Sequence, residues 1–118
     1  MPSHLEIGKA GEKLAAEYLA NNGYTILHRN WRCGHEEIDL IAIKDSLLHF
    51  VEVKYRSSNL HGHPEEAVNK KKIRTLLRGI EQFLYQHPQY NDFRLDILSI
   101  TEKQGCDAEY FFIEDVTL

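Results

Sequence analysis

The sequence has few cysteines, no surplus of basic residues and no long apolar run. Its two cysteines, Cys33 and Cys106, lie far apart and outside any CxxC spacing, so we expect reduced thiols. The formal net charge is −4, whereas nucleic-acid-binding proteins usually carry a basic surplus. Any nucleic-acid binding must therefore come from a local patch. No apolar stretch approaches the ~20 residues that a membrane-spanning helix needs.

The first residues, Met-Pro-Ser-His-Leu-Glu, have neither a basic run nor an apolar one. We therefore expect no signal peptide, and we predict a soluble, cytoplasmic protein without a membrane partner. Hydrophobic residues make up 42% and charged residues 27%, which is ordinary for globular proteins and excludes disordered, collagen-like and coiled-coil chains. A length of 118 residues predicts one domain, residues 1–118, with a single modest core.

Two segments have the spacing of apolar residues that predicts a helix. The first runs from Leu5 to Asn22 and ends at the helix-stopping pair Asn22-Gly23. The second is stronger, runs through Ile73–Leu84, and should end near His87-Pro88. Residues 59–64, which precede it, are predicted to form a loop.

Five segments have the alternation or the β-branched and aromatic content of strands. They are Tyr24–Arg32, Glu37–Lys44, Leu47–Arg56, Phe93–Ile100 and Tyr110–Val116. The first three, with a tight turn at Asp45-Ser46, suggest an antiparallel meander. The element order αβββαββ predicts an α/β fold with a mixed sheet flanked by two helices.

The turn decides which residues of the second and third strands face each other. If Asp45-Ser46 is a two-residue loop, Lys44 faces Leu47, and antiparallel pairing sets Asp39 opposite Glu52. A slip of one residue would turn the two acids to opposite faces of the sheet. The register is therefore a geometric prediction that a structure can test.

Several charged residues of this hairpin are predicted to share one face, with Glu37 opposite Lys54. They are Glu37, Asp39, Glu52, Lys54 and Arg56. Carboxylates that face each other repel, so Asp39 and Glu52 call for a cation, and Mg²⁺ or Mn²⁺ suits carboxylate oxygens. The backbone carbonyl of Val53 could be a further ligand. Lys54 could neutralise charge on a phosphate or position water, and Arg56 could contact phosphate.

A charged strand face also has a purely structural explanation, because antiparallel strands often carry charges on the side that faces water. Here Ile41, Ile43 and Phe50, which the alternation assigns to the same face, are apolar. The acids therefore lie at the border of a buried surface, which favours a functional site over a structural ion pair.

Five ordered segments carry a resemblance to known proteins. They are Gly8-Lys9-Ala10-Gly11-Glu12, Glu37-Ile38-Asp39-Leu40-Ile41-Ala42, Phe50-Val51-Glu52-Val53-Lys54-Tyr55-Arg56, Glu66-Ala67-Val68 with Lys71 or Lys72 downstream, and Arg94-Leu95-Asp96. The spacing of Asp39 and Glu52-Val53-Lys54 resembles the PD-(D/E)XK nuclease superfamily, which includes restriction enzymes and archaeal Holliday-junction resolvases. Over nearly its whole length the chain is similar to the YraN-like family of uncharacterised bacterial proteins.

This resemblance implies a restriction-endonuclease-like αβββαβ core, to which an extra C-terminal strand is added. It implies that Asp39 and Glu52 are metal ligands and that Lys54 is the catalytic lysine. It also implies that Glu12 is an acid approaching from the first helix, where Gly11 would allow close contact with the sheet. The position of Glu12 alone fits a solvated side chain paired with a neighbouring lysine equally well.

A basic stripe on the second predicted helix consists of Lys71, Arg74 and Arg78. It could follow a nucleic-acid backbone, although charged helix faces are usually just solvated. Trp31 and Tyr55 could stack on bases, but strand aromatics more often pack in a core. Asp96 follows Arg94 on the same strand face, which suggests a structural ion pair.

Our leading hypothesis from the sequence is a metal-dependent nuclease that acts on DNA or another nucleic acid. A non-catalytic nucleic-acid-binding module and a scaffold partner in a DNA-processing assembly are the alternatives. The Asp39, Glu52 and Lys54 set favours chemistry. The negative charge and small size indicate that the domain could need a homodimer or a protein partner to bind strongly.

Overall fold

The protein is described here from a computed structural model. It describes residues 4–56, 69–102, 105 and 107–116, with side chains from residue 10 onward. The loop predicted at residues 59–64 lies outside this range, as does Cys106, while Cys33 is a free thiol.

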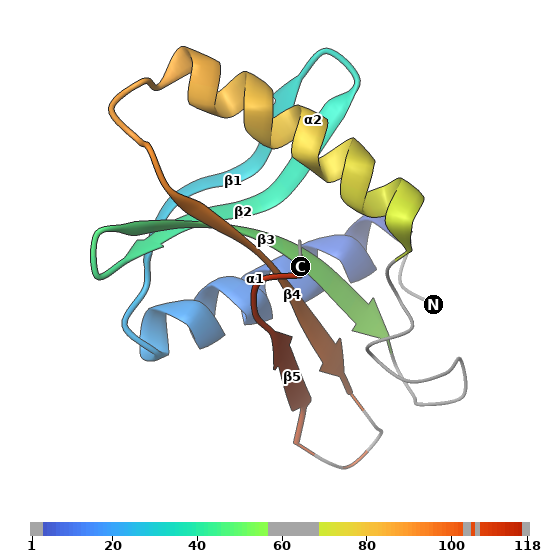
Figure 1. Ribbon diagram of the computed structural model, residues 1–118. Helices are drawn as coiled ribbons and strands as arrows, with labels where there is room; N and C mark the ends of the chain where they lie inside the picture. The colour runs from blue at the N-terminus through green and yellow to red at the C-terminus, as the bar shows by residue number, and fades with distance from the viewer. Residues whose placement is uncertain (1–3, 57–68, 103–104, 106, 117–118) are drawn as a thin grey trace.

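The described part of the chain folds into two helices and five strands in the predicted order (Figure 1). They are α1 (His4–Asn21), β1 (Thr25–Cys33), β2 (Glu36–Lys44), β3 (Leu47–Arg56), α2 (Lys70–Gln86), β4 (Phe93–Thr101) and β5 (Glu109–Ile113). The predicted strand β5 was too long at its end. Asp115 has a φ of 52°, and Val116 donates its N–H to the Leu95 carbonyl, so the chain turns back onto β4 instead of continuing as a strand.

The strands form one mixed sheet in the order β1-β2-β3-β4-β5. Strands β1, β2 and β3 make the predicted antiparallel meander, β4 runs parallel to β3, and β5 returns antiparallel to β4. The parallel neighbours β3 and β4 need a long crossover, and α2 lies within that connection. The predicted α/β class with a mixed sheet and two flanking helices is confirmed.

The β2–β3 turn has the two-residue form on which the predicted register depends. Asp45 and Ser46 have φ values of 51° and 66°, and positive φ at both central residues matches the right-handed twist of a hairpin. Lys44 pairs with Leu47, and the register continues to the pair Leu40 and Val51. The predicted register is confirmed over this range.

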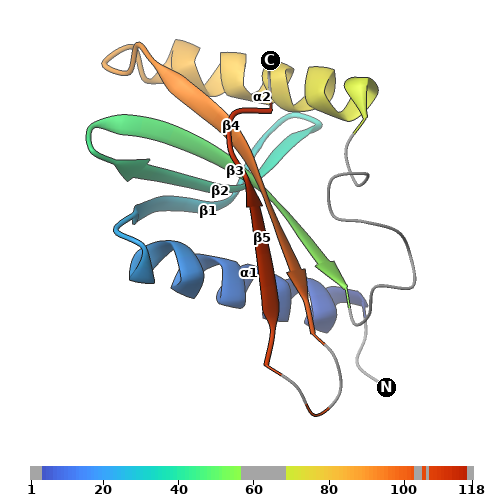
Figure 2. The same ribbon diagram turned by 60° about the horizontal axis from the view of Figure 1, so that its bottom comes forward.

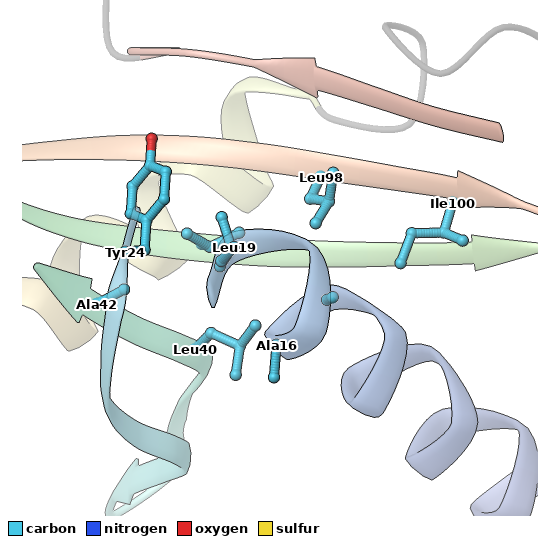
Figure 3. Packing of buried hydrophobic residues seen from close by; sticks show 9 residues of the cluster. Ala16, Leu19, Tyr24, Leu40, Ala42, Leu98 and Ile100 are labelled. Atoms are coloured by element: carbon cyan, nitrogen blue, oxygen red, sulfur yellow. The ribbon is translucent and has the colours of Figure 1, made fainter. Parts of the chain in front are cut away.

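The two helices cover opposite faces of the sheet, so the chain has three layers (Figure 2). On the α1 face, side chains of the helix pack against β2 and β4, as Figure 3 shows for Leu19, Leu40 and Leu98. On the α2 face, Phe83 packs against Phe50 of β3. Each fully buried large apolar side chain contributes about 1.5–3 kcal/mol to folding. Neither helix of the described segments is long and apolar enough to cross a membrane.

Gly11 sets how closely α1 approaches the sheet. A Cβ placed on Gly11 would lie 2.7 Å from the Cβ of Tyr55 on β3, which is closer than real side chains come. A larger residue would therefore push the helix away from β3. The close approach expected at this glycine is confirmed.

Candidate active site

Asp39 and Glu52 meet where the β2–β3 ladder ends. The last pair of the ladder is Leu40 with Val51, and the next residue on each strand is one of the two acids. Instead of a backbone carbonyl, Oδ2 of Asp39 accepts the N–H of Val53 at 2.9 Å. The Asp39 carboxylate thus takes the place of a backbone acceptor at this point, and the two acids meet.

The strand alternation of β2 breaks at Asp39. Ile38 packs in the core on the α2 face, whereas Leu40 packs in the core on the α1 face. Residues two apart in a regular strand share a face, so the chain rotates between them. Asp39 consequently directs its carboxylate sideways to the backbone of β3. The prediction that it projects to the same face as Glu52 was wrong in this respect, although the two carboxyls do meet.

Burial and like charge act together on the acid pair. Glu52 is only 7% exposed. The pKa of Asp39 is raised to about 7, first by burial and then by its hydrogen bond to Glu52 and the negative charge there. The N–H of Val53 and the charge of Lys72 act in the opposite direction. Near neutral pH the Asp39 carboxyl is therefore partly protonated unless a cation replaces its proton.

The donor set fits a small divalent cation. In a strand, the N–H and C=O of one residue point to the same side, so the Val53 carbonyl also faces β2, toward Asp39. Among the described residues there is no group of three or more acidic, histidine or cysteine side chains that could hold a metal. The protein would therefore offer two carboxylates and a carbonyl, which suits Mg²⁺, an ion that keeps several waters and commonly binds phosphate oxygens as well.

Lys54 lies two residues after Glu52 on β3 and hence on the same face, toward α2. It is half-buried and pairs in the parallel register with Ser99, whose hydroxyl is buried and has no hydrogen-bond partner in the described chain. The prediction that Glu37 lies opposite Lys54 was wrong, because the β2–β3 pairing ends before it reaches these residues. It pairs with Arg32 of β1 at 3.3 Å instead.

Glu12 reaches the sheet at the level of the acids but from the other face. Its Oε2 accepts a hydrogen bond of 2.8 Å from the side chain of Asn30. Asn30 lies between the residues of β1 that pair with Ile38 and Leu40, so it is level with Asp39. Glu12 thus approaches from the α1 face, whereas Glu52 faces α2, and its catalytic role stays a prediction.

Helix α2 carries exposed basic residues and one lysine that points toward the acids. Lys71, Arg74 and Arg78, the residues of the predicted basic stripe, are exposed, and Arg78 pairs with Glu36 at 3.6 Å. The residue that reaches the acids is Lys72, whose Nζ lies 3.4 Å from Oε2 of Glu52. Lys72 was not among the predicted site residues. The signal was present, because Lys72 is four residues before the buried Leu76 and so lies on the inward stripe.

Arg56, the last residue of β3, is half-buried, and its backbone carbonyl accepts the N–H of Glu102 at 2.9 Å. Its expected contact with phosphate stays a prediction. The predicted Arg94–Asp96 ion pair was wrong. Asp96 is fully buried and pairs with Nδ1 of His49 at 2.7 Å, while Arg94 pairs with Asp92 and Asp115.

Trp31 and Tyr55 serve packing, which is the more common role of strand aromatics. Trp31 packs edge-on against Phe83 of α2. Tyr55 covers Gly11 and donates its hydroxyl to Glu102 at 2.9 Å. Both rings are partly buried against the two core clusters.

A family model for "Uncharacterised protein family UPF0102" matches residues 11–100, a span that contains Asp39, Glu52, Lys54 and Lys72. The chain belongs to this family. Among curated UPF0102 proteins, one from Bacteroides thetaiotaomicron is 43% identical over 105 residues, covering 89% of this chain and 87% of that protein. One from Chlorobium chlorochromatii is 48% identical, covering 83% and 76%, and one from Flavobacterium johnsoniae is 40% identical, covering 99% and 95%.

Among solved structures, the Holliday junction resolvase Hjc from Archaeoglobus fulgidus is similar with a TM-score of 0.49. The sequences are 14% identical, and the match covers 87% of this chain and 74% of that chain. A likeness of this degree carries no argument about the activity of a UPF0102 protein.

Proposed function

We propose that this protein is a divalent-metal-dependent nuclease that hydrolyses nucleic-acid phosphodiesters, with DNA as the expected substrate. The observation that supports this proposal best is the meeting of the Asp39 and Glu52 carboxyls at the end of the β2–β3 ladder. Two buried acids that repel each other destabilise a fold, and a bound cation would offset this repulsion. Mg²⁺ or Mn²⁺ and a cytoplasmic location belong to the same proposal.

Each residue of the site would have a distinct task. Asp39, Glu52 and the Val53 carbonyl would hold the cation. The chemistry that a divalent cation supplies at such a position is polarisation of a phosphate oxygen and activation of water. The Lys54 ammonium would neutralise the charge that builds on the phosphate or orient the attacking water. In the overall hydrolysis, the OH of water joins phosphorus, the bond to the leaving oxygen breaks, and that oxygen takes the proton.

The outer side of α2 would position the nucleic acid. Lys71 and Arg74 are exposed beside the helix turn that carries Lys72, so phosphates bound there would lie close to the acids. Arg56 would add a phosphate contact, and Glu12 would act through Asn30 at the level of Asp39. The same exposed cations also favour a second candidate, a module that binds nucleic acid without cutting it.

Cleavage assays test the proposal directly. The purified protein is incubated with single-stranded, duplex and branched DNA and with RNA, in Mg²⁺, in Mn²⁺ or in chelator. We expect cleavage with either cation and none in chelator. Glu52→Gln and Lys54→Met should lower the rate, while Glu37→Gln is the matched control, since it removes one exposed carboxylate of β2 outside the site.

The outcomes separate the candidates. Equal cleavage by the parent, Glu52→Gln and Lys54→Met would show that the active-site assignment is wrong. Salt-dependent binding without cleavage, weakened by replacing Lys71 and Arg74, would favour the binding module. No binding to any nucleic acid would leave the scaffold hypothesis, and oligomeric state in solution would then be the next measurement.

A further inference from the structure

Lys72 connects the acid pair to the outer surface of α2. Its ammonium lies 3.4 Å from Oε2 of Glu52, and its sequence neighbour Lys71 is exposed on the other side of the helix turn. The Lys72 side chain is 41% exposed, whereas that of Glu52 is 9% exposed. The ion pair therefore joins a buried carboxylate to a cation that is partly in solvent.

The start of α2 fixes the direction in which Lys72 points. Asn69 caps the helix and accepts the Lys72 N–H at 2.9 Å. One and two turns later, Leu76 and Gly79 face the sheet, and a Cβ on Gly79 would already lie 3.5 Å from the Ile38 side chain. The helix is thus close to β2, and its rotation keeps Lys72 on the inward stripe while Lys71 stays outside.

The acid pair needs a counter-charge, and Lys72 provides it. A carboxylate removed from water is costly unless it is paired. Lys72 lowers the pKa of Asp39, in opposition to burial and to Glu52. Within the described chain, the ion pair of Glu52 is with Lys72, and Lys54 forms no ion pair with either acid. The Lys72 ammonium, which carries one positive charge, therefore occupies the position beside Glu52 that a divalent cation would also need.

We propose that Lys72 is the resident counter-charge of the acid pair and exchanges with the incoming divalent cation. This inference rests on the proposed metal site. The ammonium and the cation need the same Glu52 oxygens and repel each other, so one must leave when the other binds. The flexible four-carbon stem lets the ammonium turn toward solvent, beside Lys71 and Arg74, where a substrate phosphate would lie. Cation binding thereby adds a phosphate contact to α2.

Metal affinity in the absence of nucleic acid tests the exchange. Mn²⁺ binding is measured by calorimetry at pH 8 for the parent, Lys72→Met and Lys71→Met. The two variants remove the same charge from adjacent positions of one helix. Removing an ammonium next to the metal site should tighten Mn²⁺ binding ~10-fold, and removing Lys71 should change it less than ~2-fold.

Equal or weaker binding by Lys72→Met would overturn the exchange. Lys72→Gln, a good helix former, repeats the measurement with a polar side chain.

Binding of DNA that is not cut tests the second half of the inference. A duplex with non-cleavable linkages is titrated with and without Mn²⁺. Lys71→Met should weaken binding by a similar factor in both conditions, because it removes an ordinary phosphate contact. Lys72→Met should weaken it only when Mn²⁺ is present, by about 5-fold. An equal loss for Lys72→Met with and without Mn²⁺ would contradict the proposed release of the ammonium.

The parent and Asp39→Asn separate failure of this inference from failure of the proposed function. If the parent binds no Mn²⁺, or Asp39→Asn binds it equally well, the metal site itself is wrong and the exchange is wrong with it. If Asp39→Asn loses binding while Lys72→Met binds no tighter than the parent, the metal site stands and the role of Lys72 fails.

Discussion

Strand β3 takes part in two buried acid sites that are opposites in chemistry. Near its start, His49 pairs with Asp96, whose second oxygen accepts the N–H of Asp115. Near its end, Glu52 faces Asp39. Burial raises the pKa of Asp96 as it does that of Asp39, but the partners of Asp96 lower it, whereas Glu52 raises that of Asp39 further. The first acid is satisfied by a histidine and a backbone N–H, whereas in the second site two acids oppose each other and the ammonium of Lys72 is their counter-charge.

The two acid sites differ in whether their partners offset the cost of burial. A buried carboxylate with a histidine and a backbone N–H has a complete set of partners and holds strands together. A buried carboxylate opposed by another carboxylate is stored electrostatic strain, and such groups gather at sites that bind cations or move protons.

Glu52→Gln should reduce the cleavage rate ~1,000-fold, because one carboxylate ligand and its negative charge are lost from the metal site. Its fold should be at least as stable as the parent's without metal, since a like-charge contact disappears. Single-turnover cleavage and urea unfolding measure the two quantities. Retention of more than a tenth of the activity would contradict the assigned role of Glu52.

Asp96→Ala should lower the free energy of unfolding by ~3 kcal/mol, because it leaves His49 buried without its partner and removes the acceptor of the Asp115 N–H. The cleavage rate per folded molecule should stay near that of the parent. Urea unfolding provides the first number, and activity scaled to the folded fraction provides the second. A loss of activity without loss of stability would mean that the two sites are not separate.

In chelator, the parent should lose stability as pH rises. The folded-state pKa of Asp39, about 7, lies above the ordinary value of 3.8 for this side chain. The native state therefore binds more protons than the unfolded state between these values, and stability falls from pH 4 to pH 7 and is then constant. The expected fall is ~1–2 kcal/mol after allowance for partial exposure. Asp39→Asn should lack this fall in urea unfolding at pH 5 and pH 8, and an unchanged slope would show that Asp39 is not its source.

Mg²⁺ should stabilise the fold more at pH 8 than at pH 5, because the cation binds ionised carboxylates and must otherwise displace a proton. At ten times its dissociation constant, a ligand specific for the native state adds about 1.4 kcal/mol. Thermal unfolding with and without Mg²⁺ at both pH values measures this effect. Equal stabilisation at both pH values, or stabilisation that survives in Asp39→Asn, would place the binding elsewhere.

Much of the fold followed from local patterns. The apolar period of 3.6 in α2 and the alternation in β3 are properties of short segments, so they predicted elements whose bounds are right to within a few residues. The Asp45-Ser46 turn adds a second constraint, because a two-residue loop permits one register. The hairpin register by itself therefore predicts that Asp39 approaches Glu52.

Other features depend on distances between segments far apart in the chain. At Asp39 the alternation of β2 breaks and the carboxylate accepts the Val53 N–H, a side-chain bond to the backbone that strand alternation ignores. Asp96 finds His49 across a parallel pair, and no spacing within β4 indicates that partner. Lys72 lay on a predictable stripe, yet its contact with Glu52 exists only because α2 packs close to β2.

The helices, the strands, the turn and the approach of two acids on one hairpin are all predictable from short segments, since each depends on backbone geometry over a few residues. The burial of Glu52, its pairing with Lys72 and the pairing of Asp96 with His49 depend instead on how distant segments pack. Burial and ion pairing follow from the distance and orientation at which whole elements pack, and those quantities are set by the complete core.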